Sequence, residues 1–168
     1  MTIVNHSSYG VESLEANSPL KLRILPAPVP LFRQGIILQI VVSAPRSSVE
    51  DGDHVRSIMV NALLDTGATN TSIDETIAKK LMLSPIGFSE IGTAGGKRTS
   101  ATYVADISFP GLGLLPQRML RIGSCNLSFN EKIGTSRPQN LGALIGRDIL
   151  SKWLVVWNGP GATVSICD

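Results

Sequence analysis

The sequence is poor in aromatic and charged residues. Of its 168 residues, 5% are aromatic and 17% are charged, against about 25% charged in an average soluble protein. Lysine and arginine (15) nearly balance aspartate and glutamate (13), which leaves a net charge of +2. A nucleic-acid-binding domain typically carries a basic stripe or aromatic side chains that stack on bases. Because the sequence has neither, we expect no nucleic-acid partner.

A long hydrophobic run is also missing. Gln39 interrupts the longest apolar segment, Ile36–Val42, whereas a membrane-spanning helix needs about 20 apolar residues. Residues 1–20 contain Glu12 and Glu15 and no apolar stretch of the kind found in secretory signals. We therefore expect no membrane partner, and these absences favour a cytoplasmic location.

Cysteine and histidine are scarce as well. Neither Cys125 nor Cys167 lies in a CxxC pattern, and the two histidines do not form HExxH. Zinc sites need closely spaced ligands, and disulfide-stabilised folds need several cysteine pairs. The sequence therefore predicts no metal, no organic cofactor and no disulfide framework.

Short aliphatic and β-branched runs, separated by turns with glycine and proline, are abundant. Such runs are typical of β-strands. The predicted strands are Leu20–Leu25, Ile36–Val42, Val55–Leu64, Thr99–Phe109, Met119–Ile122, Trp153–Trp157 and Ala162–Cys167. The turn Asn158-Gly159-Pro160-Gly161 joins the last two, which predicts a C-terminal hairpin.

The length allows about one domain. Eight or nine short strands with turns between them are typical of a closed barrel or a sandwich, so we predict an all-β domain over residues 35–168. The proline-rich segment Pro26–Pro30 cannot lie inside a central strand. It separates this domain from a predicted N-terminal arm, residues 1–34.

Two short helices are expected within this β domain. Ser72 and Glu75 have the spacing of a capping box, which predicts a short helix that ends near Leu81 with two lysines in its last turn. A second helical turn is expected after Arg147.

One segment has the composition of a catalytic site. The apolar strand up to Leu64 ends in Asp65, followed by Thr66, Gly67 and Ala68. A carboxylate at the end of a buried strand is costly to ionise unless donors surround it, and Gly67 can bring a backbone N–H close. The alternative is structural, with Asp65 closing an Asx-type turn. The tripeptide alone does not decide between the two.

Two further segments complete a pattern. Ile91–Lys97 (IGTAGGK) is a glycine-rich hairpin tip between strand-like flanks, and Gly142–Leu150 (GALIGRDIL) contains an aliphatic pair followed by Gly-Arg-Asp. Asp-Thr-Gly-Ala, a glycine-rich hairpin and an aliphatic pair before Gly-Arg, in this order, resemble the retropepsins, the single-domain retroviral-type aspartic peptidases. The resemblance extends over Ile36–Cys167.

The resemblance implies a retropepsin-like closed β-barrel or sandwich that is active as a twofold homodimer. Asp65 matches the catalytic aspartate. Thr66, Gly67 and Ala68 match residues that support it, with the Thr66 hydroxyl reaching the partner chain. Arg147 matches the arginine of the family's Gly-Arg turn, and we expect it to bind a carbonyl or an ion-pair partner. The residues expected to contact a bound peptide are Thr69, Ile91, Gly92, Thr93, Ala94, Gly95, Gly96 and Leu144, of which Ile91–Gly96 match the flap that closes over substrate.

Two features depart from the family pattern. Thr69 and Asn70 stand where many viral members carry acidic residues, so the usual acidic partner of Arg147 is missing, and Asp148 is one possible substitute. The N-terminal arm and the stretch 110–140 are longer than a minimal member needs.

A single Asp-Thr-Gly gives an independent reason to expect a dimer. Peptide hydrolysis without a covalent intermediate needs one carboxylate to activate water and one carboxylic acid to protonate the substrate. No other aspartate in the chain precedes Thr-Gly or Ser-Gly. The second carboxylate must then be Asp65 of another copy, across a twofold axis.

These features predict a homodimeric aspartic endopeptidase that acts on extended segments of a peptide or protein. The alternative is a catalytically idle retropepsin-like domain, retained as a dimerisation or peptide-binding module. Intact Asp65, Thr66 and Gly67 favour the enzyme, because a binding module does not need a buried pair of like charges.

Overall fold

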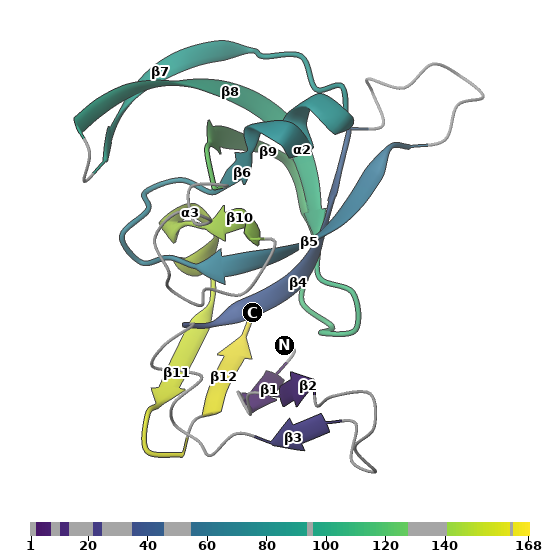
Figure 1. Ribbon diagram of the computed structural model, residues 1–168, viewed down its shortest axis with the longest axis vertical. Coiled ribbons are helices and arrows are strands. Elements are labelled where there is room, and N and C mark those ends of the chain that lie inside the picture. The colour runs from purple at the N-terminus through teal and green to yellow at the C-terminus, as the bar shows by residue number, and fades with distance from the viewer. Residues whose placement is uncertain are drawn as a thin grey trace.

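The computed structural model describes residues 35–45, 55–93, 96–127, 141–161 and 163–168, together with the backbone of three strands nearer the N-terminus. These ranges form short strands and two short helices (Figure 1). The strands are β1 (Ile3–Ser7), β2 (Val11–Ser13), β3 (Leu22–Ile24), β4 (Ile37–Ser43), β5 (Ser57–Leu64), β6 (Ser72–Asp74), β7 (Gly87–Thr93), β8 (Gly96–Ser108), β9 (Gln117–Cys125), β10 (Leu141–Ile145), β11 (Leu154–Asn158) and β12 (Thr163–Cys167). The helices are α2 (Glu75–Lys80) and α3 (Arg147–Leu150). The prediction of an all-β fold with one or two short helices is confirmed.

Six of the strands close into a barrel. Their hydrogen-bonded order is β4-β5-β10-β6-β9-β8, and β8 pairs back to β4, with Ile107 opposite Val42. Alternate residues along a strand point to opposite faces, so one face of each strand lines the interior. Buried aliphatic side chains from around the ring fill it, including Leu38, Ile40, Ile73, Ile122 and Ile145. Burial of each such side chain stabilises the fold by about 1.5–3 kcal/mol. The predicted closed barrel is therefore present.

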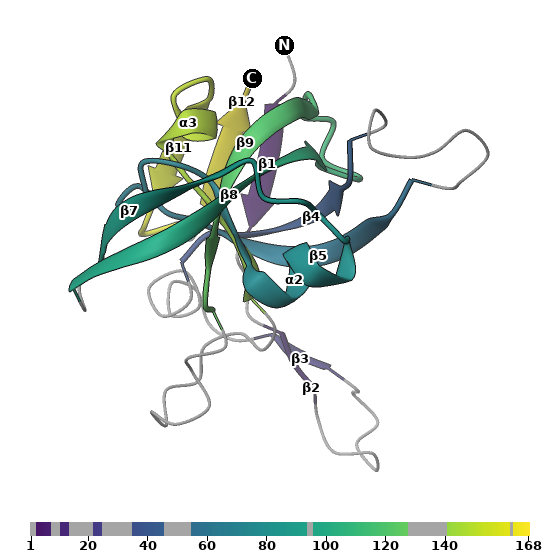
Figure 2. The same ribbon diagram turned by 90° about the horizontal axis from the view of Figure 1, so that it is seen from above.

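The hairpin of β7 and β8 extends beyond this barrel. The C-terminal half of β8 lies in the barrel wall, where Ala105 and Ile107 are buried. Its first residues, 96–99, are exposed and pair with β7. Figures 1 and 2 show this part of the hairpin as an arm that projects from the barrel. Ala94 and Gly95, between the two strands, lie outside the described residues.

The C-terminal strands form a second, smaller sheet, drawn below the barrel in Figure 1. β12 pairs with β11 on one side and with β1 on the other. This confirms the hairpin predicted around Asn158–Gly161, and it adds a strand from the predicted N-terminal arm. Trp153, just before β11, is buried edge-to-face against Phe109, with ring centroids 5.1 Å apart. This aromatic pair attaches the sheet to the barrel core.

The helix α2 begins at a different cap from the predicted one. Asp74 is the N-cap, and its carboxylate accepts hydrogen bonds from the Thr76 N–H at 2.9 Å and the Thr76 hydroxyl at 2.6 Å. Ser72 instead lies in β6, because its pairing with Gly123 of β9 keeps the chain extended. The predicted cap is therefore wrong, while both predicted helices, including the turn after Arg147, are present. No helix in the described part of the chain is long and apolar enough to cross a membrane.

Candidate active site

The loop from Asp65 to Thr71 joins β5 to β6 around the end of β10. β10 lies between these strands, parallel to β5 and antiparallel to β6. Leu144 is opposite Leu63 on one side and Ser72 on the other. Because β10 separates the two strands, the connecting loop must pass over its C-terminal end. This topology brings the Asp-Thr-Gly segment against Gly146 and Arg147, about 80 residues later in the sequence.

Backbone hydrogen bonds fix Asp65 at the end of β5. Its N–H donates to the Ile145 carbonyl at 2.9 Å, and its carboxylate Oδ1 accepts the Gly67 N–H at 2.8 Å. A Cβ at Gly67 would lie 3.1 Å from this Oδ1, so glycine permits the close approach. The Asx-type turn left open by the sequence is therefore formed. The side chain nevertheless stays partly exposed, so the carboxylate is oriented and still accessible to a ligand.

The Arg147 guanidinium donates two hydrogen bonds to the same loop. Its Nη1 donates to the Thr66 carbonyl at 2.8 Å and its Nη2 to the Thr69 hydroxyl at 2.9 Å. The Arg147 N–H donates to the Ala68 carbonyl at 3.0 Å. The Thr69 hydroxyl thus accepts the hydrogen bond for which an acidic partner was expected. Asp148 does not substitute in that role among the described contacts.

Asp148 instead anchors the far end of the loop. Its carboxylate accepts the Thr71 N–H at 2.9 Å and the Thr71 hydroxyl at 2.8 Å. The same hydroxyl accepts the Gly146 N–H at 3.1 Å. A Cβ at Gly146 would lie 2.4 Å from the carbonyl carbon of Asn70, so only glycine fits. Sequence reasoning missed this part of the site, although the Gly-Arg-Asp run after an aliphatic pair was its signal.

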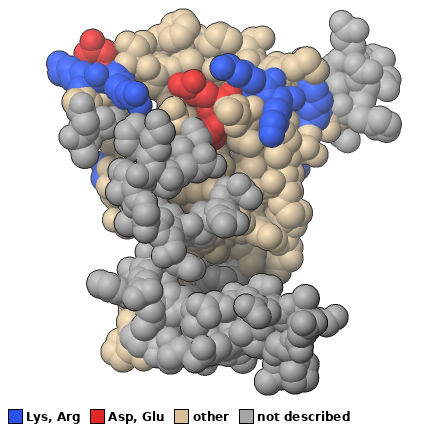
Figure 3. Space-filling view, in the orientation of Figure 1, with Lys and Arg blue, Asp and Glu red and all other residues tan. Residues whose placement is uncertain are grey.

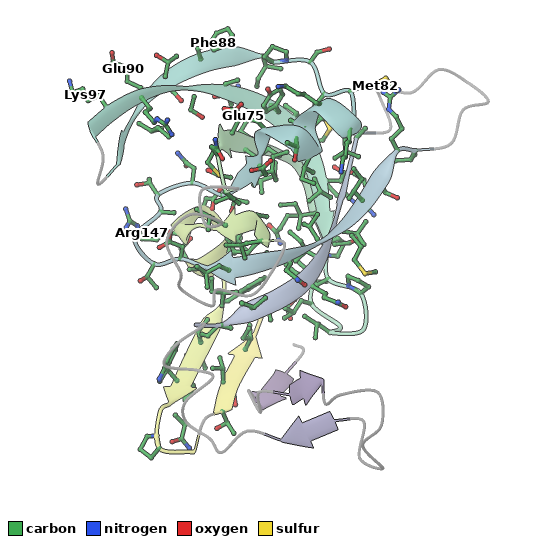
Figure 4. All side chains as sticks on the ribbon, viewed as in Figure 1. Glu75, Met82, Phe88, Glu90, Lys97 and Arg147 are labelled. Carbon is green, nitrogen blue, oxygen red and sulfur yellow. The ribbon has the colours of Figure 1, made fainter. Side chains whose placement is uncertain are left out.

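The predicted flap is an antiparallel hairpin. Ile91 is opposite Arg98, Gly92 opposite Lys97, and the backbone of Thr93 opposite Gly96. Gly96 has φ +109°, a conformation that favours glycine. Figure 4 shows the end of this hairpin on the same side of the molecule as Arg147. The described structure brings Asp65–Thr69, Leu144 and Arg147 together, while the hairpin residues project separately. The two flap residues Ala94 and Gly95 lie outside the described residues.

The segment that contains this site matches a known protein family. A model of the aspartyl protease family matches residues 52–146, more than half of the 168 residues. The chain belongs to this aspartyl protease family. The matched range includes the Asp65 loop, the β7–β8 hairpin and β10, and it confirms the resemblance drawn from the motifs.

Among solved structures, the chain matches the crystal structure of a retropepsin-like aspartic protease from Rickettsia conorii. The two are 12% identical, the match covers 78% of this chain and 91% of that chain, and the TM-score is 0.42. A search of the curated proteins finds no match.

The chain has an apolar groove beside its Asp65 loop. The groove has a volume of about 600 Å³ and is lined by Ile36, Leu64, Thr66, Leu150, Trp153, Leu154, Val155 and Trp157. Thr66 belongs to the loop itself, so we call this surface the Thr66 groove. Leu154 and Trp157, from the edge strand β11, are 63% and 52% exposed. Large apolar side chains exposed together are typical of a surface that contacts another molecule.

Of the two free cysteines, Cys125 is not suited to act as a nucleophile. Burial raises the pKa of the Cys125 thiol to about 12, with further contributions from the carboxylates of Asp74 and Glu75. A thiol that stays protonated at neutral pH is a poor nucleophile. Among the described residues, no group of three or more His, Cys, Asp or Glu side chains could hold a metal ion.

Proposed function

We propose that this chain is a homodimeric aspartic endopeptidase that hydrolyses peptide bonds in extended polypeptide segments. Two Asp65 carboxylates, one from each subunit, activate the attacking water. The observation that carries the proposal is the geometry of Asp65, whose carboxylate is fixed by the Gly67 N–H at 2.8 Å and remains partly exposed. Membership of the aspartyl protease family supports it.

The reaction divides two tasks between the paired carboxylates. One is ionised and removes a proton from water, while the other is protonated and donates a hydrogen bond to the scissile carbonyl oxygen. Two like charges about 3 Å apart cannot both ionise cheaply, so a single shared proton supplies both states. The rigid support of Asp65 by Ile145 and Gly67 serves this pairing, because both carboxylates must meet without a large adjustment.

The Thr66 groove supports a second copy of this chain as the partner. If two Asp65 carboxylates meet across a twofold axis, Thr66, the next residue, lies close to that axis as well. The groove that Thr66 lines is then part of the contact between subunits, and Leu154 and Trp157 lose their exposed apolar surface there. The Thr66 hydroxyl is then available to the partner's loop.

The β7–β8 hairpin has the form of a lid over a bound peptide. An extended substrate would bind by main-chain hydrogen bonds, with alternate side chains in pockets. In this proposal Leu144 contacts the peptide from the side of the Asp65 loop, and the hairpin closes over it, with Gly92 and Gly96 allowing the backbone to approach closely.

The test is the substitution Asp65→Asn, which keeps the side-chain volume and removes the shared proton. With a fluorogenic peptide library, we expect cleavage to fall by about 10³-fold or more, with the thermal unfolding temperature retained. A matched control is Asp106→Asn, since Asp106 pairs with Arg118 away from the loop. Wild-type cleavage should also stop with a pepstatin-type inhibitor. Cleavage by the folded Asp65→Asn protein at the wild-type rate would refute the assignment, and an inactive wild type would favour the idle module.

A further inference from the structure

The two faces of the β7–β8 hairpin differ in charge. Residues directly opposite in an antiparallel pair share a face. Phe88 is opposite Ala101, and Glu90 is opposite Thr99. Lys97 lies on this same face, with its Nζ 3.8 Å from a Glu90 carboxylate oxygen. Figure 4 shows Phe88, Glu90 and Lys97 along the outer, convex side of the hairpin. The outer face thus carries its own paired charges.

Arg98 follows Lys97 and therefore points to the opposite, concave face, as does Ile91 across from it. Along β8, Ser100 and Thr102 share the face of Arg98, and Thr102 is opposite Gly123 of β9. A Cβ at Gly123 would lie 3.4 Å from the Ser100 hydroxyl, which confirms that these residues share one face.

The same face continues across the sheet to the catalytic loop. Gly123 is opposite Ser72 of β6, which is opposite Leu144 of β10. Leu144 is in turn opposite Leu63 of β5, two residues before Asp65. Register therefore places Arg98 and Asp65 on one continuous face, the face turned away from the barrel interior. A peptide bound between the hairpin and the Asp65 loop would therefore have Arg98 on one side and Asp65 on the other.

The Arg98 guanidinium has no partner in the described part of the chain. It is exposed and makes no ion pair there, either with Glu75 at the start of α2 or with Glu90, which pairs with Lys97 on the other face. Asp148, which anchors the Asp65 loop, accepts hydrogen bonds from Thr71. In the view of Figure 3, Lys and Arg atoms gather over the end of the β7–β8 hairpin. The face of the hairpin that carries Arg98 thus presents a cation without an ion-pair partner among the described residues.

We propose that Arg98 selects substrates by binding a carboxylate within a few residues of the scissile bond. This inference rests on the proposed endopeptidase function and names its substrate class: extended peptides with an acidic residue facing the hairpin. A guanidinium binds a carboxylate through two parallel hydrogen bonds, which gives both attraction and orientation. Closure of the hairpin excludes water around this pair and strengthens it.

The test compares peptides that differ only in Glu or Gln at each position flanking the cleaved bond. With C-terminally amidated peptides, the wild type should cleave the best Glu peptide about tenfold better than its Gln counterpart in kcat/KM, mainly through KM. This preference should decrease with added salt. A second set of peptides has a free C-terminal carboxyl group and no acidic side chain. If Arg98 binds only a terminal carboxylate, these peptides are cleaved better than their amidated counterparts, whereas the amidated Glu and Gln peptides are cleaved equally well. That result would overturn the proposal.

Substitutions at Arg98 and Lys97 test which face of the hairpin provides the Glu preference. Arg98→Gln should abolish the Glu preference and Arg98→Lys should keep part of it. Lys97→Gln removes the same charge from the adjacent residue on the outer face, and it should leave the preference intact. An unchanged preference in folded Arg98→Gln would overturn the proposal, as would an equal loss in Lys97→Gln.

A binding measurement separates this proposal from the proposed function. Fluorescently labelled Glu and Gln peptides are titrated against the Asp65→Asn protein and its Arg98→Gln derivative. Tighter binding of the Glu peptide that depends on Arg98 supports the selectivity even if no variant cleaves. Cleavage that depends on Asp65 but shows no Glu preference refutes the selectivity alone. An absence of both peptide binding and cleavage overturns both proposals.

Discussion

The Asp65 loop and the β7–β8 hairpin differ in the hydrogen bonds that hold them in place. The loop is bonded to elements distant in the sequence, with Asp65 on Ile145, Ala68 on Arg147 and Thr71 on Asp148. The outer part of the hairpin is bonded across its own two strands, and its ion pair is 73–84% exposed.

This contrast corresponds to two different requirements of a peptidase site. A carboxylate that must meet a second one across a symmetry axis needs a fixed position, which several hydrogen bonds to elements distant in the sequence provide. A lid must open for the substrate, and segments with few buried contacts open at low free-energy cost. Substitutions in the loop should therefore affect stability strongly, whereas substitutions in the hairpin should affect ligand binding and leave stability nearly unchanged.

Gly146→Ala should have the largest effect on stability. The added Cβ would lie 2.4 Å from the Asn70 carbonyl carbon and 2.7 Å from the Thr71 nitrogen, so backbone must move. We expect the free energy of unfolding to fall by about 3 kcal/mol in urea denaturation. Gly92→Ala in the hairpin, where a Cβ would meet no atom within 4 Å, should change it by less than about 0.5 kcal/mol. Equal losses in the two variants would contradict the contrast.

Asp148→Ala should have the next largest effect. It leaves the Thr71 N–H and hydroxyl without their carboxylate acceptor at the end of the loop. The expected loss is about 2 kcal/mol, because hydrogen bonds to a charged, partly buried group are strong. Glu90→Ala removes a carboxylate from the exposed hairpin pair and should cost about 0.5 kcal/mol or less. A smaller loss for Asp148→Ala than for Glu90→Ala would show that the loop is not anchored as described.

Thr69→Val should have a smaller effect on stability, because it removes only one hydrogen bond of Arg147 to the loop. The substitution keeps the side-chain shape and removes the hydroxyl that accepts from Nη2, while the bond from Nη1 to the Thr66 carbonyl remains. We expect a loss of about 0.5–1 kcal/mol by thermal denaturation. Thr69→Asp supplies a carboxylate for the guanidinium and should recover stability to the wild-type value or above it. If Thr69→Asp is less stable than Thr69→Val, the guanidinium does not need an acceptor at this position.

Strands such as β8 and β11 and the Asp-Thr-Gly segment were predictable because their signals are local. Alternating apolar residues mark β8, and the turn at Asn158–Gly161 marks the C-terminal hairpin. The insertion of β10 between β5 and β6 was not predictable, because a run such as Leu-Gly-Ala-Leu-Ile does not specify its neighbours. The cap of α2 was assigned wrongly to Ser72 because β pairing outweighed a local pattern.

The same limit explains which site residues the sequence missed. Thr71 and Asp148 are 77 positions apart in the sequence, and they meet only because the Asp65 loop passes over the C-terminal end of β10. In the sequence, Arg98 is a charged residue that follows the glycine-rich tip, and no local pattern gives it a role. Its position on the face of Asp65 follows from strand register across β8, β9, β6, β10 and β5, which no local pattern specifies.

The most direct test of the central claim, one catalytic carboxylate from each of two copies, is subunit mixing. Wild-type protein at a fixed concentration is equilibrated with a ninefold excess of Asp65→Asn protein before assay. Random pairing should reduce cleavage to about one-tenth of that of the wild type alone, because mixed dimers carry one carboxylate and one amide. An Asp65→Asn protein that also carries Trp157→Lys in the Thr66 groove should not pair, and it should leave activity unchanged. Undiminished activity with the first variant, under conditions where subunits exchange, would contradict the account.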